Sequence, residues 1–199
     1  MTKVPVTIYA EMTPNPGVMK FVANKVLNAG SPVDYTTSSD VSNSPLAAKL
    51  LSFPFVDSVF IANNYVSVTK NYQIEWDMVQ MELREFIRDY INDGGVVLKE
   101  AVEKETVAEQ ISVSNEPLNV ATSEVDQKII DALNEYIRPA VESDGGSIDF
   151  KSFREGKVNV VLRGACSGCP SSTVTLKQGI EGLLKKLVPE VTEVVSEAI

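Results

Sequence analysis

The alternation of apolar and polar residues in the first half of the chain predicts a small domain of strands and helices. We expect four strands in it, at residues 4–10, 20–27, 56–62 and 65–70. Asn63 and Asn64 join the last two strands as a tight hairpin turn, because asparagine tolerates positive φ angles. Residues 28–43 are rich in small polar side chains and predict a loop with one short extended piece.

Two helices are expected in the same half of the chain. Ser44, with proline at the next position, predicts the start of a short helix that runs through Leu51. A longer helix starts at Trp76, and its apolar positions fall on one face: Val79, Leu83, Phe86, Ile87, Tyr90 and Ile91. The Asp-Gly-Gly sequence at residues 93–95 ends it. Because this spacing matches a buried face, we assign Trp76 to the core and no chemistry to this half.

Residues 96–122 differ in character from the segments on either side. They contain no aromatic residue, and their glutamates outnumber their lysines. Such a segment buries too little apolar surface to offset the entropy of ordering, so it predicts a flexible acidic linker with a transient helix near residues 100–110. The linker divides the chain into a domain of residues 1–95 and a domain of residues 123–199.

The second domain predicts the element order α-β-β-α-β. Its first helix opens at Ser123 with a capping-box-like sequence. The apolar face of that helix comprises Val125, Ile129, Leu133, Tyr136, Ile137 and Ala140. Strands are expected near residues 148–151, 157–162 and 191–196. A helix capped by Ser171 or Ser172 extends to Val188, so the whole chain is predicted to be two small α+β domains.

The chain has only two cysteines, Cys166 and Cys169. Their CxxC spacing places both in one glycine-containing loop between a predicted strand and a predicted helix. Two thiolates at this spacing can bind one soft metal centre, and amides of the loop and of the helix start would favour the ionised sulfurs. A tetrahedral metal site or a four-cysteine cluster needs four ligands, so the remaining ligands must come from outside this chain.

The composition excludes several classes of function. Without histidine the chain lacks Ser-His-Asp and Cys-His catalysis and histidine-ligated zinc, and neither GxxxxGK[ST] nor GxGxxG occurs. A net charge of −9 opposes binding to nucleic acid or to an anionic membrane. The first six residues lack the features of a signal or transit peptide, and no apolar run could span a bilayer. A cytoplasmic protein is therefore expected, with no membrane partner.

Several motifs of the second domain occur together: Ile137-Arg138-Pro139, Asp144-Gly145-Gly146, Leu162-Arg163-Gly164-Ala165-Cys166-Ser167-Gly168-Cys169-Pro170-Ser171-Ser172 and Val188-Pro189-Glu190-Val191. In this combination, residues 123–199 resemble the C-terminal domain of NifU and Nfu-type iron-sulfur cluster carriers. The first domain is similar to the Nfu N-terminal domain at residues 13–16 (Thr-Pro-Asn-Pro), 44–47 (Ser-Pro-Leu-Ala) and 66–70 (Val-Ser-Val-Thr-Lys).

The resemblance implies an iron-sulfur cluster assembly and carrier protein without enzymatic activity. It implies a 4Fe-4S cluster, in preference to 2Fe-2S, that is bound between two chains and transferred to apo-proteins. Cys166 and Cys169 match the two cysteines that ligate the cluster in the family. A cluster-loaded homodimer, an upstream cluster scaffold and apo iron-sulfur recipients are the partners that follow from it.

Two other functions remain open. A strand-CxxC-helix order also occurs in thioredoxin-like dithiol oxidoreductases. Against that function, the pattern indicates no βαβ setting, and Arg163-Gly164-Ala165 replaces the aromatic entry that such motifs usually carry. The other alternative is a structural zinc ion that two chains share through four thiolates.

Overall fold

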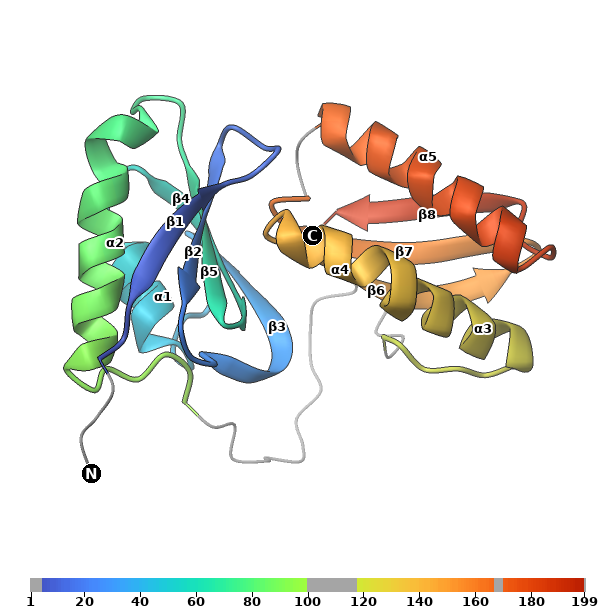
Figure 1. The fold of residues 1–199 in the computed structure, drawn as a ribbon, viewed down its shortest axis with the longest axis horizontal. Coiled ribbons are helices and arrows are strands. Elements are labelled where there is room, and N and C mark those ends of the chain that lie inside the picture. Colours follow the sequence, from blue (N-terminus) through green and yellow to red (C-terminus); the bar gives the residue numbers. More distant parts are fainter. Residues whose placement is uncertain (1–4, 100–117, 167–169, 199) are drawn as a thin grey trace. The chain divides into compact units, whose positions relative to one another are not determined.

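The computed structural model describes residues 5–99, 118–166 and 170–198 (Figure 1). Helices and strands both contribute to two separate compact units, one on either side of residues 100–117. This confirms the prediction of two α+β domains. None of the helices in the described part of the chain combines the length and the hydropathy that a membrane span requires.

The first domain is a five-stranded antiparallel sheet with two helices packed against one face (Figure 1). Its elements are β1 (Ile8–Met12), β2 (Val18–Ala23), β3 (Asn28–Thr36), α1 (Pro45–Leu50), β4 (Val56–Asn63), β5 (Tyr65–Lys70) and α2 (Trp76–Asn92). The strands lie in the order β1-β2-β5-β4-β3. Phe21, Ile61 and Val68 from the sheet form one core with Leu50 of α1 and Leu83 of α2, and all five are fully buried.

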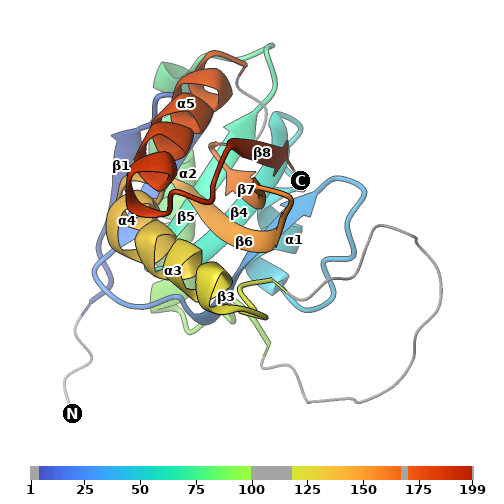
Figure 2. The ribbon, with the colours of Figure 1, turned by 90° about the vertical axis from the view of Figure 1, so that its right-hand side faces the viewer.

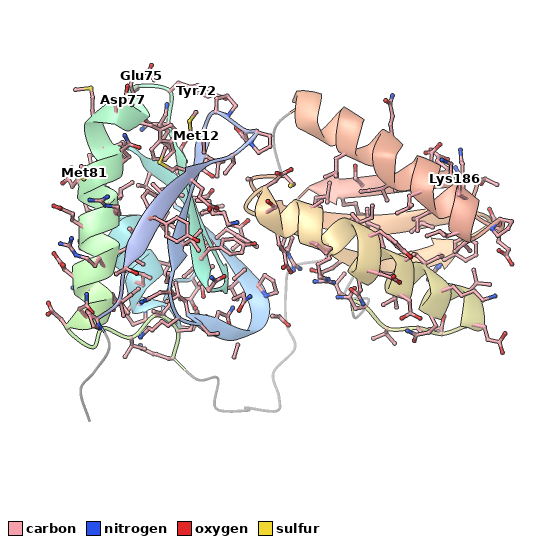
Figure 3. All side chains as sticks on the ribbon, in the orientation of Figure 1. Met12, Tyr72, Glu75, Asp77, Met81 and Lys186 are labelled. Carbon is pink, nitrogen blue, oxygen red and sulfur yellow. The ribbon has the colours of Figure 1, made fainter. Side chains whose placement is uncertain are left out.

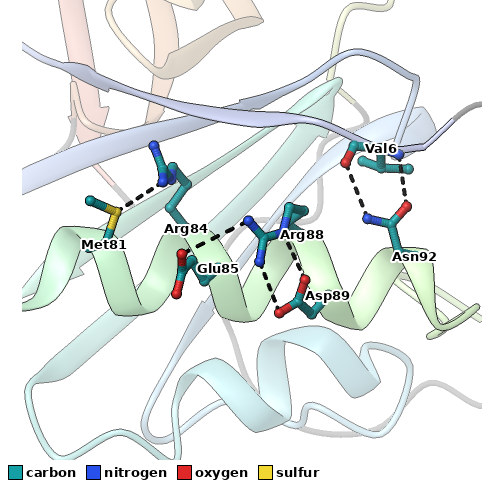
Figure 4. Close-up of polar contacts among 7 residues, drawn as sticks. All are labelled: Val6, Met81, Arg84, Glu85, Arg88, Asp89 and Asn92. Carbon is teal, nitrogen blue, oxygen red and sulfur yellow. Dashed lines mark hydrogen bonds and ion pairs between the residues drawn. The ribbon is translucent and has the colours of Figure 1, made fainter.

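Three local predictions in this domain are confirmed. The Ser44 hydroxyl caps α1 by accepting a backbone hydrogen bond at 3.2 Å. Asn63, with φ of 36°, makes the turn between β4 and β5. Gly94, with φ of 82°, follows the end of α2. The last helical residue, Asn92, exchanges hydrogen bonds of 2.8 and 3.2 Å with the backbone of Val6, which ties the segment before β1 to the end of α2 (Figure 4).

The prediction of a loop with one short extended piece over residues 28–43 underestimates the strand, because nine of these residues, Asn28–Thr36, form the edge strand β3. Gly30 and Pro32 disfavour a strand in the local pattern. Pairing with β4 nevertheless holds this segment as a strand. The register of the pairing shifts between Asn28 and Val33, which accommodates the proline at the edge of the sheet. A long-range partner decides the structure here.

The second domain is a three-stranded sheet in the order β6-β7-β8, with helices over one face (Figures 1 and 2). Its elements are α3 (Glu124–Ala132), the π-helical turn η1 (Leu133–Ile137), α4 (Arg138–Ser143), β6 (Gly146–Arg154), β7 (Lys157–Gly164), α5 (Pro170–Leu187) and β8 (Glu193–Ala198). Ile148, Phe150 and Leu162 of the sheet pack with Ile129 of α3 and Ile180 of α5. The predicted α-β-β-α-β order is confirmed.

The first helix of this domain contains a π-helical turn that the sequence pattern does not predict. Pro139 has no N–H to donate to the carbonyl four residues back, and the Arg138 N–H bonds to the carbonyl of Leu133, five residues back. The wider turn changes the phase of the helix. Two predictions for the apolar face are therefore wrong: Tyr136 is 51% exposed and Ala140 is also exposed.

Helix α5 differs from the sequence-based prediction in two respects. It begins at Pro170, so Ser171 and Ser172 lie inside the helix, and the prediction that one of them is the N-cap is wrong. The expected absence of a βαβ setting is also wrong, because β7 and β8 pair in parallel with α5 between them. The pairing joins strands that are separated by a whole helix, and local periodicity carries no signal for it.

Both ends of the predicted linker contact a domain. Val97 packs against the first core, and its carbonyl accepts a hydrogen bond from the Ser44 hydroxyl at 2.8 Å. Asn119 exchanges hydrogen bonds with the backbone of Phe150, N–H to carbonyl at 2.7 Å and N–H to the Asn119 Oδ1 at 2.8 Å. The expected helix near residues 100–110 lies outside the described residues, and the domain boundaries stay predictions.

Candidate functional site

Cys166 lies just beyond β7, in the connection to α5. Gly164, with φ of 67°, turns the chain out of the strand, a backbone conformation that suits glycine. The Ala165 N–H then donates to the carbonyl of Gly145 at 3.2 Å, which ties the connection to the end of α4. Cys169 lies outside the described residues, one position before the start of α5. The structure thus places one of the two predicted ligands.

Gly146, at the start of β6, leaves the space that the Cys166 thiol occupies. A Cβ atom at this position would lie 2.9 Å from the Cys166 Sγ and 2.6 Å from the carbonyl oxygen of Arg163. No side chain fits there without a shift of the backbone. The Asp-Gly-Gly sequence that indicates a helix stop therefore also forms the wall behind the thiol, a contact that arises only when β6 and β7 pair.

The Cys166 thiol is buried and holds its proton. The residue is 5% exposed and belongs to the core of the second domain. Burial raises the pKa of the thiol to about 11, and the negative charge of Asp144 acts in the same direction. The prediction that the loop favours an ionised sulfur is therefore wrong for Cys166 in this state, because desolvation dominates. Attack on a disulfide requires an accessible thiolate, which this environment disfavours.

We expect Cys166 to be alkylated slowly by iodoacetamide. In a metal-free Cys169→Ser variant, where Cys166 is the remaining thiol, the native protein should react at pH 8 roughly a hundredfold more slowly than the unfolded protein, because fewer thiolates are present. The rate should rise about tenfold for each pH unit up to the pKa. Mass spectrometry of quenched samples measures both rates, and a native rate within about threefold of the unfolded one would contradict the burial of this thiol.

A buried carboxylate on the other face of the sheet links three segments of the second domain. Asp149 of β6 is 5% exposed. Its Oδ2 accepts from Arg163 Nη1 at 2.8 Å, and its Oδ1 accepts from Asn119 Nδ2 at 2.8 Å and lies 3.5 Å from Arg138 Nη2. The network therefore connects Asn119, near the end of the predicted linker, with the start of α4 and the end of β7. Arg163, three residues before Cys166, is fixed by it.

The sequence pattern does not single out Asp149 or Asn119 as parts of this network. The available signal is weak: Asp149 alternates with the apolar residues Ile148 and Phe150 in β6, which an exposed strand face would also show. The partners are separated by 14 and 30 positions in the chain, so only the register of the sheet and the return of the chain at Asn119 bring them together.

The described part of a single chain offers no complete metal site. The described residues contain no group of three or more histidine, cysteine, aspartate or glutamate side chains that could hold a metal ion. The Cys166 thiol is a suitable soft ligand for iron or zinc. Further ligands would have to come from Cys169 and from outside this chain, as the cysteine count indicates.

Two family models match the chain in the order of its domains. The model described as "Scaffold protein Nfu/NifU N terminal" matches residues 8–94, and the "NifU-like domain" matches residues 129–195. The human protein "NFU1 iron-sulfur cluster scaffold homolog, mitochondrial" is 33% identical over 189 residues, which cover 92% of this chain and 69% of the human protein. The chain belongs to the NifU-like family. This confirms the resemblance found in its motifs.

Two further relatives extend along nearly the whole of this NifU-like chain. "NifU-like protein C1709.19c" of Schizosaccharomyces pombe is 35% identical over 193 residues, which cover 94% of this chain and 71% of the yeast protein. "NifU-like protein 4, mitochondrial" of Arabidopsis thaliana is also 35% identical over 193 residues, covering 96% of this chain and 65% of the plant protein. Both domains thus occur together in these relatives.

The prediction of a cytoplasmic location is wrong by this comparison, because the human and the Arabidopsis relatives are named mitochondrial. That prediction relied on the composition of the first residues of the chain. A targeting segment is removed from the mature protein, so the composition of a folded domain does not record the compartment in which it works.

Proposed function

We propose that this NifU-like protein is an iron-sulfur cluster scaffold and carrier, which binds a cluster through Cys166 and Cys169 and transfers it to apo-proteins. The observation that carries the proposal is the position of Cys166 in the connection between β7 and α5, with the second cysteine of the chain three positions later. The name of the human relative, an iron-sulfur cluster scaffold homolog, supports a role in cluster assembly. No catalytic step is required of the protein.

The number of cysteines determines the assembly in this proposal. A 4Fe-4S cluster takes four cysteine thiolates, and each chain provides two. Two chains related by a two-fold axis would therefore share one cluster, with the cysteine loops of both chains at the junction. Since the cluster binds only the pair, it stabilises the pair, and loss of iron returns single chains.

Loading requires the Cys166 side chain to leave the core. At 5% exposure its sulfur has no room for a cluster, so the connection between β7 and α5 has to turn the thiol outward. Iron also displaces the thiol proton, and the raised pKa means that cluster affinity should increase with pH. Packing in the core thus protects the Cys166 thiol when no cluster is bound. The same packing competes with the cluster for this side chain, so release of the cluster to a recipient with more cysteine ligands is feasible.

The partners and the location follow from the same proposal. The cluster would come from an upstream scaffold and pass to apo iron-sulfur proteins. We place the protein in mitochondria by its likeness to relatives that are named mitochondrial.

Anaerobic reconstitution of the full chain with iron and sulfide tests the proposal. We expect one 4Fe-4S cluster per two chains, with Mössbauer parameters that distinguish it from 2Fe-2S, and a mass by light scattering that doubles as the cluster forms. Iron and sulfide are measured on the same chromatographic fractions. Four iron atoms on a strictly single chain, in the absence of external thiol, would exclude the shared cluster.

The βαβ arrangement of β7, α5 and β8 favours a second candidate, a dithiol oxidoreductase. An insulin reduction assay on the iron-free protein separates the two functions. A carrier should leave insulin disulfides intact, whereas an oxidoreductase reduces them with dithiothreitol as the electron source.

A preparation that binds zinc alone and remains colourless after reconstitution would favour a structural zinc site instead.

A further inference from the structure

The first domain carries an exposed apolar patch that the proposed cluster site does not use. Four large side chains form it, with exposed fractions of 87% for Met12, 100% for Tyr72, 73% for Met78 and 56% for Met81. We call this group the methionine patch. Figure 3 shows Met12 and Tyr72 near the start of α2, and Met81 on the other side of this helix in the view, slightly further along it. By contrast, Met19 is buried in the core.

Three segments of the chain contribute side chains to the methionine patch. Met12 ends β1, and Tyr72 lies in the connection between β5 and α2. The Trp76 Nε1–H donates to the carbonyl of Pro16 at 2.9 Å, which ties the first turn of α2 to the connection between β1 and β2. The two α2 methionines lie three residues apart on the side of the helix away from the core. The fold therefore builds this surface from distant parts of the sequence.

The methionine patch has an acidic rim. Glu75, Asp77 and Glu82 are exposed, and residues 71–83 contain no lysine or arginine. Figure 3 labels Glu75 and Asp77 at the start of α2. Among the described residues, none of these three carboxylates takes part in an ion pair, whereas three other acidic residues of this domain do. The rim therefore places three carboxylates without a described ion pair beside apolar side chains.

The cations nearest to the methionine patch in sequence are engaged by the domain itself. Arg84 Nη2 donates to Met81 Sδ at 2.9 Å (Figure 4). Arg88, one turn further along α2, contacts Asp89 at 2.8 Å and Glu85 at 4.0 Å. Lys70 Nζ lies 5.9 Å from the centre of the Trp76 ring. Among the described residues, none of these cations forms an ion pair with Glu75, Asp77 or Glu82, so the three rim carboxylates stay available to a basic partner.

We propose that the methionine patch docks a basic helical segment with an apolar stripe, contributed by a partner protein. Exposed apolar side chains in one group mark interaction surfaces, and methionine adapts its shape to different apolar partners. The acidic rim selects a segment with flanking lysine or arginine. The same charge disfavours an anionic lipid surface and a second copy of this chain, whose net charge is −9. The docking surface does not depend on the cluster-binding proposal.

Methionine methyl NMR of the full chain tests this surface, with a helical peptide of leucine and lysine as the probe. We expect saturable shifts of the Met12, Met78 and Met81 signals, while Met19 stays unchanged as an internal control. A leucine-glutamate peptide of the same pattern should not bind, and a serine-lysine peptide without an apolar stripe should bind at least about tenfold more weakly.

Two charge-matched variants separate the acidic rim from the overall charge. The Glu75→Gln/Asp77→Asn/Glu82→Gln variant should weaken peptide binding about tenfold or more. The Asp131→Asn/Glu135→Gln/Glu190→Gln variant removes the same charge from exposed positions of the second domain and should change binding less than about twofold. Equal weakening in both variants, unsaturable shifts, or patch signals that move with protein concentration alone would overturn the proposal.

Discussion

Replacing either Cys166 or Cys169 with serine should abolish stable cluster binding by the reconstituted protein. A serine hydroxyl is a hard and weakly acidic ligand, and each chain contributes only two thiolates, so each substitution removes two of the four ligands of a shared cluster. We expect retained iron to fall to about a tenth of the wild-type value or less, and the doubled mass to be lost. Iron and sulfide analysis with light scattering measures both.

The controls for this prediction address the fold and the loop. Cys166→Ala removes the ligand without placing a hydroxyl in the core, so its loss of iron would not arise from an unsatisfied buried group. Ser167→Ala alters the same loop without touching a thiol and should keep full cluster occupancy. Circular dichroism should show native secondary structure for all variants. Wild-type iron content in the Cys166 or the Cys169 variant would contradict the site.

Replacing Asp149 with alanine should destabilise the second domain by about 3 kcal/mol, because Arg163 and Arg138 lose their buried acceptor. The ion pair between Arg163 and Asp149 contributes most of this stability, since the Arg163 side chain is 17% exposed and its Nη1 lies 2.8 Å from the Asp149 Oδ2. The Arg138 contact is longer, at 3.5 Å, and its side chain is 25% exposed, so solvent screens it more. Hydrogen exchange of the β7 amides in the full chain measures the change as a fall in protection of roughly a hundredfold.

Matched variants separate the network from the loss of a carboxylate as such. Asp131→Ala removes an exposed aspartate of α3 and should cost less than about 0.5 kcal/mol. In an Asp149→Ala/Arg163→Met variant, much of the protection should return, because the more buried of the two guanidinium groups is gone and Arg138 keeps its hydrogen bond to Asn134. The fluorescence of Trp76, the single tryptophan, reports on the first domain and should be unchanged. A loss below about 1 kcal/mol for Asp149→Ala would show that the network contributes little to stability.

Parts of the candidate site could be predicted from the sequence and parts could not. The two cysteines, their loop and the need for outside ligands follow from residue identity and spacing alone. The buried state of Cys166 does not, because its raised pKa depends on Gly146 and Asp144 lying beside it. The Asp149 network likewise depends on the register of β6 against β7, which pairs Asp149 with Val161 and places Arg163 two residues further along the same face.

The sequence by itself determined those elements that depend on interactions among a few neighbouring residues. The Ser44 cap, the Asn63 turn and the amphipathic helix α2 are such cases, since hydrogen bonds and turns between near neighbours fix them. Tertiary structure decided the features that depend on distant partners: the strand β3, the parallel pairing of β7 with β8, and the burial of Cys166. Their stabilising contacts join residues that the chain brings together only on folding, so no short stretch of sequence specifies them.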